Sequence, residues 1–207
     1  MRLYADRILP RLLDLTMRTG RLAPYRQRVI AQANGRVLEI GAGSGLNLPL
    51  YPARVSEVVA LDSHARLLAM ARGRQCAARF TCVEASAETI PWDNASFDTV
   101  VSTWTLCSIP GVAQALREVR RVLRPGGRFL FVEHGLAPEA DASVRRWQQR
   151  LTPAWRRVAG GCHLNRAIPE IVRQAGFEIT YLETSYVEGP RPMTFTYEGW
   201  ASVRPAD

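Results

Sequence analysis

One glycine-rich stretch near the start of the chain has the residue types and spacing to hold a nucleotide. Glu39 is followed, at intervals of two residues, by Gly41, Gly43 and Gly45. An apolar run precedes the glycines, so the stretch predicts a strand, a tight turn and a helix that starts near Leu46. Such a turn presents backbone N–H groups and a helix amino terminus to a polar ligand, and glycine lets the ligand approach without a Cβ clash.

The spacing of the glycines distinguishes two kinds of nucleotide loop. A dinucleotide fingerprint, G-x-G-x-x-G, requires a third glycine at position 46, where the chain has Leu46. The chain instead has an acidic residue followed by three alternate glycines, E-x-G-x-G-x-G. A glycine turn with a purely structural role remains the alternative interpretation.

A carboxylate follows the next apolar run, about 20 residues beyond the glycine loop, where ribose recognition requires one. Asp62 ends the run Val58-Val59-Ala60-Leu61. At the tip of a second strand it can accept hydrogen bonds from both ribose hydroxyls. Alternatively, Asp62 caps the helix expected after it. Its pairing with the glycine loop favours the ribose interpretation.

Apolar runs alternate with helical patterns along the chain. Strands are expected at 36–40, 57–61, 79–83, 97–102, 128–133, 177–186 and 194–203. Helices are expected at 46–50, 64–73, 111–123 and 168–174, and a helical stretch broken at Pro153 is expected at 143–159. This alternation predicts an α/β domain with a mostly parallel sheet covered on both faces. Ligands of such sheets bind at the carboxyl ends of the strands.

Length and composition fit a single domain. The chain has 207 residues, of which 47% are hydrophobic, enough for a sizeable core. No stretch approaches the ~18 uncharged apolar residues of a membrane span, and Met1 to Gly20 is studded with Arg and Asp, unlike a secretory signal. We therefore expect a cytoplasmic protein. Its four cysteines lack C-x-x-C spacing and are expected to be reduced.

The charge of the chain is strongly positive, and all of its basic residues are arginine. The net charge is +8, with 27 Lys and Arg residues of which none is lysine. The use of arginine at every basic position, with no lysine, indicates a coding bias rather than selection for a basic surface. The arginines are scattered and no RNA-binding motif accompanies them, so we expect no nucleic-acid partner. An anionic substrate or membrane surface stays compatible with the charge.

The N-terminal residues 1–30 are expected to be helical. Leu9, Leu12 and Leu13 share one face, and arginines decorate the rest. Three interpretations are open: a lid over the ligand site, a basic amphipathic contact with a membrane through residues 1–22, or an ordinary docked helix.

Together with three later segments, the glycine pattern resembles the class I methyltransferases that use S-adenosylmethionine. The segments 85–92, 96–101 and 121–127 occur in the family's order, so the likeness covers residues 36–135. It implies S-adenosylmethionine as cofactor and a Rossmann-like, doubly wound sheet of seven strands, in the order 3-2-1-4-5-7-6 with strand 7 antiparallel. It also implies one methyltransferase domain over 1–207, with a helical lid at 1–30, a cofactor-binding core at 36–135, and substrate-side helices and the last two strands at 136–207.

The resemblance and the predicted strand ends together give the candidate cofactor-binding residues. Ser86 stands where the family usually has an aspartate near the adenine amine. Trp104 is expected to stack near the adenine or face the sulfonium, with core packing as the alternative. The full set is Glu39, Gly41, Ala42, Gly43, Gly45, Asn47, Asp62, Ser63, Ser86, Ala87, Thr103 and Trp104.

A closer resemblance extends from about residue 36 to residue 180. It is to the vertebrate methyltransferase-like thiol S-methyltransferases and to a group of short bacterial relatives. The likeness implies a small-molecule thiol as acceptor. The vertebrate enzymes carry an apolar membrane anchor at the N-terminus, where this chain has an amphipathic, Arg-rich segment. The segments that carry it are 45–47, 51–52, 105–108, 133–134, 147–149, 153–155 and 161–166.

The candidate catalytic residues are His134, Cys107 and Asn165. His134 follows the fifth strand, where it is placed to take a thiol proton or to orient the acceptor, with a structural histidine as the alternative. We expect the acceptor pocket between the tip of that strand and residues 160–166. Cys107 and Cys162 also suggest two further hypotheses, a metal site and a site that binds trivalent arsenic. Structural zinc spacing is absent and arsenite methyltransferases need three placed thiols, so no metal is expected.

Two other functions stay open at this point. One is an N- or O-methyltransferase that acts on a phospholipid amine or a quinone precursor. The other is a cofactor-binding protein without turnover, against which the intact glycine motif, Asp62 and His134 argue.

Overall fold

The computed structural model describes residues 8–203, which form one sheet with helices around it. The helices are α1 (Leu9–Met17), α2 (Ala23–Ile30), α3 (Ala65–Ala71), α4 (Val112–Val122), α5 (Ala142–Val158), α6 (Ile168–Gln174) and α7 (Arg191–Thr194), with short 3-10 turns at η2 (Leu48–Leu50) and η3 (Glu139–Asp141). The strands are β1 (Gly35–Ile40), β2 (Val55–Asp62), β3 (Arg79–Glu84), β4 (Phe97–Thr103), β5 (Leu123–His134), β6 (Phe177–Tyr186) and β7 (Phe195–Val203).

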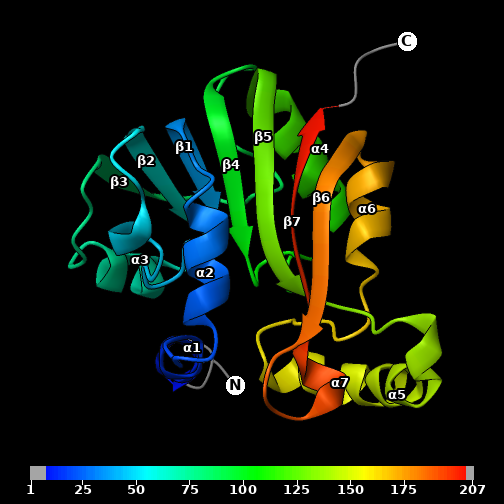
Figure 1. The fold of residues 1–207 in the computed structure, drawn as a ribbon. Helices are drawn as coiled ribbons and strands as arrows, with labels where there is room; N and C mark the ends of the chain where they lie inside the picture. The colour runs from blue at the N-terminus through cyan, green and yellow to red at the C-terminus, as the bar shows by residue number, and fades with distance from the viewer. Residues whose placement is uncertain (1–7, 204–207) are drawn as a thin grey trace.

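The seven strands have the order β3-β2-β1-β4-β5-β7-β6. The pairs β1–β2, β1–β4, β2–β3 and β4–β5 are parallel, whereas β7 runs antiparallel to both β5 and β6. This order and the reversed seventh strand confirm the predicted fold. The arrowheads of the other strands point to one edge of the sheet, the lower edge in Figure 1, where α1, α5 and α7 lie. That edge is where a ligand is expected.

Both faces of the sheet are buried, as continuous apolar strands require. Side chains alternate between the faces along a strand, so Phe129 and Phe131 join one core cluster while Leu130 and Val132 join the other. The first cluster includes the apolar stripe of α4 and part of α6, and the second includes Val29 of α2. The sheet is therefore held rigidly between two apolar layers.

The predicted helix at 46–50 is wrong. Residues 43–47 form turns, and only the 3-10 turn η2 follows at Leu48–Leu50. The physical reason lies in the backbone on both sides. Gly43 and Gly45 have positive φ values of 56° and 73°, which no α-helix tolerates, and Pro49 within η2 and Pro52 just after it lack the N–H that a continuing helix would need.

Two other boundaries differ from expectation. Pro153 does not break the 143–159 stretch, because α5 runs unbroken from Ala142 to Val158 with the proline inside it. The lost hydrogen bond is offset by the burial of one side of α5, including Gln148, which bonds Ala137, Gly135 and Pro192. Strand β5 begins at Leu123, five residues early, with an irregular register before Arg128.

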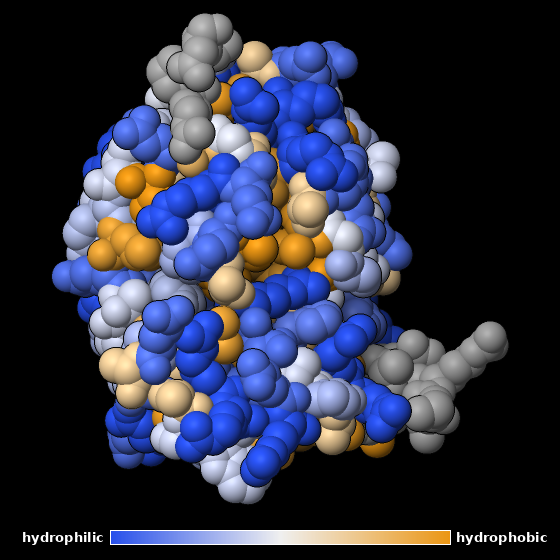
Figure 2. Space-filling view, turned by 90° about the vertical axis from the view of Figure 1, so that its right-hand side faces the viewer, coloured by the Kyte–Doolittle hydropathy of each residue, from blue (hydrophilic) through white to orange (hydrophobic). Residues whose placement is uncertain are grey.

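The described part of the chain contains no helix long and apolar enough to cross a membrane. Figure 2 shows the face on the right-hand side of Figure 1, which is mostly hydrophilic, with hydrophobic patches across its middle. The exposed large apolar side chains lie on two helices at the ligand-binding edge. They are Ile8, next to α1, Leu12 and Leu15 of α1, and Trp147 and Val158 of α5.

Candidate active site

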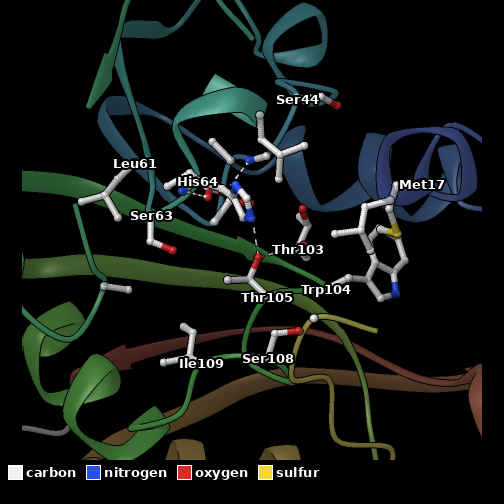
Figure 3. A pocket seen from close by; sticks show the side chains of 18 of the residues that line it. Met17, Ser44, Leu61, Ser63, His64, Thr103, Trp104, Thr105, Ser108 and Ile109 are labelled. Atoms are coloured by element: carbon white, nitrogen blue, oxygen red, sulfur yellow. Dashed lines mark hydrogen bonds between the residues drawn. The ribbon is translucent and has the colours of Figure 1, made fainter. Parts of the chain in front are cut away.

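A cavity of about 470 Å³ lies at the carboxyl ends of β1, β2 and β4. Its size is in the range of small-molecule and cofactor sites. Figure 3 shows Met17 and Trp104 at one end of the cavity, Leu61 and Ser63 at the other, and Ser108 and Ile109 below. Of the predicted cofactor-binding residues, nine line the cavity: Gly41, Ala42, Gly43, Asp62, Ser63, Ser86, Ala87, Thr103 and Trp104.

The three glycines of the loop have different structural roles, although all three have positive φ. A Cβ at Gly41 would collide with the side chain of Thr105, and one at Gly45 would lie 2.9 Å from the Cβ of Ala71 in α3. A Cβ at Gly43 would meet only the Gly41 carbonyl, at 3.9 Å. Gly41 and Gly45 therefore fix the loop against its neighbours, and Gly43 is the glycine with open space at the cavity.

Glu39 and Asn47 brace the loop instead of lining the cavity. The Glu39 carboxylate accepts hydrogen bonds from Asn47 Nδ2 at 2.8 Å and from the Tyr51 hydroxyl at 2.7 Å. Burial raises the pKa of Glu39 to about 7, against the lowering effect of these bonds. Asn47 Oδ1 in turn accepts a bond from Arg26 at 3.0 Å. Tyr51 and Arg26 were not predicted from the sequence, because neither belongs to the glycine motif.

Asp62 ties the glycine loop to the tip of β2. One carboxylate oxygen accepts the Gly43 N–H at 2.9 Å, and the other accepts the His64 N–H at 2.8 Å. Burial raises the pKa of Asp62, and these two bonds counteract the shift. The N-cap of α3 is His64, so Asp62 is not the cap itself. The carboxylate lines the cavity with its remaining acceptor capacity, which fits a ribose hydroxyl.

Trp104 sits at the tip of β4 in a strained conformation. Its φ is +50°, a region that a bulky residue rarely adopts, and its N–H donates to Val132 at 2.8 Å. The guanidinium of Arg26 lies over the Trp104 ring, 4.7 Å from the ring centre. Burial lowers the pKa of Arg26 to about 10, so it stays positively charged at neutral pH. Trp104 lines the cavity and also packs against a buried cluster, and its predicted contact with the cofactor stays a prediction.

Ser63, Ser86 and Ala87 complete the far side of the cavity. The Ser86 hydroxyl accepts the Glu88 N–H at 3.1 Å and lies 3.4 Å from a Glu88 carboxylate oxygen. The Ser86 hydroxyl therefore already donates and accepts hydrogen bonds within its own turn, which limits the hydrogen bonds that it can make to a ligand.

Helix α1 closes the cavity from outside through Leu9, Leu13, Asp14 and Met17. Asp14 is buried and accepts a short hydrogen bond from the hydroxyl of Ser44, in the glycine loop. The placement puts α1 at the cavity, and its predicted role as a lid stays a prediction. The expected apolar face is only partly right, since Leu12 is exposed. Residues 1–7 of the proposed membrane contact lie outside the described residues.

Cys107, His134 and Cys162 meet behind one wall of the cavity and do not line it. Their ligand atoms lie within 4.8 Å of one another, and His134 Nε2 is 2.9 Å from Cys162 Sγ. A hydrogen bond from Cys162 lowers the pKa of the Cys107 thiol, helped by His134. Gly160, in the segment predicted to border the acceptor pocket, lines the cavity, but the residues at the tip of β5 do not. Asn165 is half-buried and away from the cavity wall.

Glu133, next to His134, was missed by sequence reasoning as a site residue. It is fully buried, and one carboxylate oxygen accepts the Ser102 hydroxyl at 2.7 Å and the Thr105 N–H at 3.0 Å. Burial, followed by the charge of Cys107, raises the pKa of Glu133 to about 8. An acidic residue inside an apolar strand was the signal that could have identified it. Its role is to hold the 103–105 turn that forms the cavity floor.

The sheet order, the glycine loop and the carboxylate at the tip of β2 define the class I methyltransferase architecture, with a cavity suited to S-adenosylmethionine. Comparisons with known proteins agree. Residues 38–131 match the family model described as a methyltransferase domain. The S-adenosylmethionine-dependent methyltransferase of Mesorhizobium loti, in its crystal structure, is 20% identical with a TM-score of 0.62, covering 88% of this chain and 98% of that one.

Two curated relatives are more similar in sequence. The thiol S-methyltransferase TMT1A of Homo sapiens is 34% identical over 173 residues, 82% of this chain and 67% of that protein. A phosphatidylethanolamine N-methyltransferase of Cereibacter sphaeroides is 35% identical over 166 residues, 74% of this chain and 77% of that protein. The chain belongs to the S-adenosylmethionine-dependent methyltransferases. It spans about two thirds of the length of the thiol S-methyltransferase.

Proposed function

We propose that this methyltransferase transfers the methyl group of S-adenosylmethionine to the thiol of a small molecule. The observation that carries the proposal is the similarity to a thiol S-methyltransferase over 82% of the chain. The composition of the cavity supports it. Leu13, Met17 and Ile109 give the wall an apolar surface that suits an uncharged, weakly solvated acceptor.

The transfer is an in-line displacement in which the acceptor sulfur attacks the methyl carbon and the sulfonium sulfur leaves with the bond's electron pair. The protein must align the three atoms and exclude water. Asp62 and the glycine loop hold the cofactor, while α1 covers the cavity. A free thiol has a pKa of about 8.5, so a modest positive potential increases the reactive thiolate. The charged Arg26 at the cavity supplies such a potential.

An amine acceptor is the second candidate, because the bacterial phosphatidylethanolamine N-methyltransferase covers 74% of the chain at 35% identity. An amine must lose a proton before attack, as a thiol does, but its ammonium form is cationic. The cation Arg26 at the cavity stabilises an anionic thiolate, whereas it gives no such help to a neutral amine and repels the ammonium form that predominates in solution, so the amine is the weaker candidate.

A panel of acceptors separates the two functions. The purified protein is incubated with S-adenosylmethionine and an alkyl thiol, an aryl thiol, a phenol or a phospholipid amine, and S-adenosylhomocysteine and the methylated product are quantified by mass spectrometry. We expect thioether formation from at least one thiol. The Gly43→Val variant, designed to lack cofactor binding, gives the background for each acceptor. Methylation of the amine or phenol without any thioether would overturn the proposal.

A further inference from the structure

The cluster formed by Cys107, His134 and Cys162 does not line the cavity. Its three members come from different segments: the turn after β4, the last residue of β5 and the loop after α5. All three ligand atoms are buried and lie within 4.8 Å of one another. Two thiols and an imidazole at such distances form a donor set that soft and borderline metal ions prefer.

We propose that Cys107, His134 and Cys162 bind one zinc ion. The three protein ligands leave the fourth position of a tetrahedral ion to a water molecule, and their spacing is close to what such an ion needs. With Zn–S of about 2.3 Å and Zn–N of about 2.0 Å, ligand atoms are roughly 3.5–3.8 Å apart. The pair His134 Nε2 and Cys162 Sγ, now 2.9 Å apart, has to separate by less than about 1 Å.

The chemistry of the donors fits a divalent ion. On binding, each thiol releases its proton to solvent and forms a metal–sulfur bond, while the neutral imidazole donates the lone pair of Nε2. Two thiolates then balance the two positive charges, so the buried site carries no net charge. The Nδ1 atom of His134 has no hydrogen-bond partner among residues 8–203, so no contact there prevents Nε2 from presenting its lone pair.

The position of the cluster, next to two segments that line the cavity, indicates a structural role for the ion. Ser108 follows Cys107 and lines the cavity, and Gly160 lines it two residues before Cys162. The carbonyl of Cys107 accepts the backbone N–H of His163 at 2.9 Å, so the two segments already touch. The ion fastens the loop after α5 to the ends of β4 and β5 and thereby fixes the cavity wall. This role is independent of which acceptor the enzyme methylates.

Metal titration of the reduced, chelator-stripped protein tests the proposal. Calorimetry with Zn²⁺ is expected to give one ion per chain, and Co²⁺ is expected to give the visible spectrum of a tetrahedral, thiolate-ligated ion. Cys162→Ala, in the loop, should weaken zinc binding at least tenfold. The matched control is Cys82→Ala, which removes a free thiol outside the cluster and should leave binding unchanged.

Two further measurements keep the test decisive. Thermal unfolding checks that Cys162→Ala is folded, and His134→Asn gives a second ligand variant. Hydrogen exchange of residues 159–163 should slow on zinc addition to the wild-type protein but not to Cys162→Ala. The proposal is overturned if the reduced wild-type protein binds no zinc, if Cys162→Ala binds it equally well, or if exchange at 159–163 does not respond. No acceptor is present in these titrations, so a failed thiol assay leaves them interpretable.

Discussion

The glycine loop and the Cys107–His134–Cys162 cluster lie at the same edge of the sheet, but they are assembled over different distances in the chain. In the loop, Glu39 bonds residues 8 and 12 positions away, and Gly43 bonds Asp62 across 19 positions. In the cluster, His134 contacts Cys162 across 28 positions, and Cys107 joins from a third segment. The hydrogen bonds of the loop lie within one strand–turn–strand unit, whereas the cluster forms only when β4, β5 and α5 pack together.

The two regions also handle buried charge differently. In the loop, the carboxylate of Glu39 is surrounded by donors from Asn47 and Tyr51. In the cluster, Nδ1 of His134 is buried with no hydrogen-bond partner among residues 8–203, and the same holds for one carboxylate oxygen of the adjacent Glu133. A fully satisfied polar network rigidifies a site, while buried groups without partners mark a place where something further is to be bound or moved. We therefore expect mutations in the loop to act on cofactor binding and on the stability of the loop.

Gly43→Val should have the largest effect on the loop side. The valine places a branched side chain at the cavity and forces a positive φ on a residue that resists it, so binding of S-adenosylmethionine should fall below detection in calorimetry. Gly126→Val is the matched control, because Gly126 also has positive φ and open space but lies outside the cavity lining. Both variants should lose about 1–3 kcal/mol of stability to strain. Equal cofactor affinity in the two variants would contradict the assignment of the loop.

The difference in sequence separation between contacting residues also explains which parts of the site could be predicted from the sequence. Glu39, the glycines and Asp62 form a local pattern with fixed spacing, so their association could be predicted. The fold followed from strand–helix alternation for its class, and from the family resemblance for its strand order. The approach of residues 160–166 to the tip of β5 was predicted from the family resemblance and the strand ends, but the direct contact of His134 with Cys162, outside the cavity lining, depends on the docking of α5 onto the sheet, which no local pattern encodes. The same holds for Arg26 of α2, which reaches Asn47 and Trp104 only through packing.

The pH dependence of stability tests the buried carboxylate of the loop. The pKa of Glu39 is about 7 in the folded protein, against 4.5 for an ordinary glutamate. Between these values the folded state holds a proton that the unfolded state has lost, so stability falls as pH rises from about 4.5 to about 7, by roughly 3 kcal/mol. Glu39→Gln removes this loss, so its unfolding free energy in urea should depend less on pH.

The control for this experiment is Glu57→Gln, which removes a half-buried carboxylate paired with Arg36 on the neighbouring strand. Its stability should keep the pH slope of the wild-type protein. Parallel curves for wild type and Glu39→Gln between pH 5 and pH 8 would show that Glu39 is ionised in the folded loop.

Asp62→Ala should weaken S-adenosylmethionine binding at least tenfold. Charge-assisted hydrogen bonds to two ribose hydroxyls are worth roughly 1.5–3 kcal/mol together. Asp98→Ala is a suitable control, because Asp98 also accepts a backbone N–H, from Arg36 at 2.7 Å, but lies outside the cavity lining. Both variants lose a backbone bond, and only Asp62→Ala should lose cofactor affinity in calorimetry. Unchanged affinity would mean that Asp62 only shapes the loop.

The smallest effect is expected from the contact that joins α1, the proposed lid, to the glycine loop. Asp14 of α1 accepts the Ser44 hydroxyl, pairs with Arg18 at 2.7 Å and lies 3.5 Å from Arg74. Asp14→Ala removes the bond to the loop and leaves the Ser44 hydroxyl without its partner, at a cost of about 1–2 kcal/mol. Part of that cost falls on the closed lid, so S-adenosylmethionine should dissociate two- to tenfold faster in stopped-flow measurements.

Two companion variants separate the hydrogen bond of the lid from its charge. Asp14→Asn keeps an acceptor for Ser44 but loses the ion pairs, so a dissociation rate close to wild type assigns the effect to the hydrogen bond. Glu188→Gln breaks the exposed pair with Arg21 and should change nothing, since exposed pairs contribute little. If Asp14→Ala and Glu188→Gln release the cofactor at the same rate, α1 does not hold the cavity closed. The N-terminal segment is then a docked helix rather than a lid, and the cofactor is retained by the locally wired loop alone.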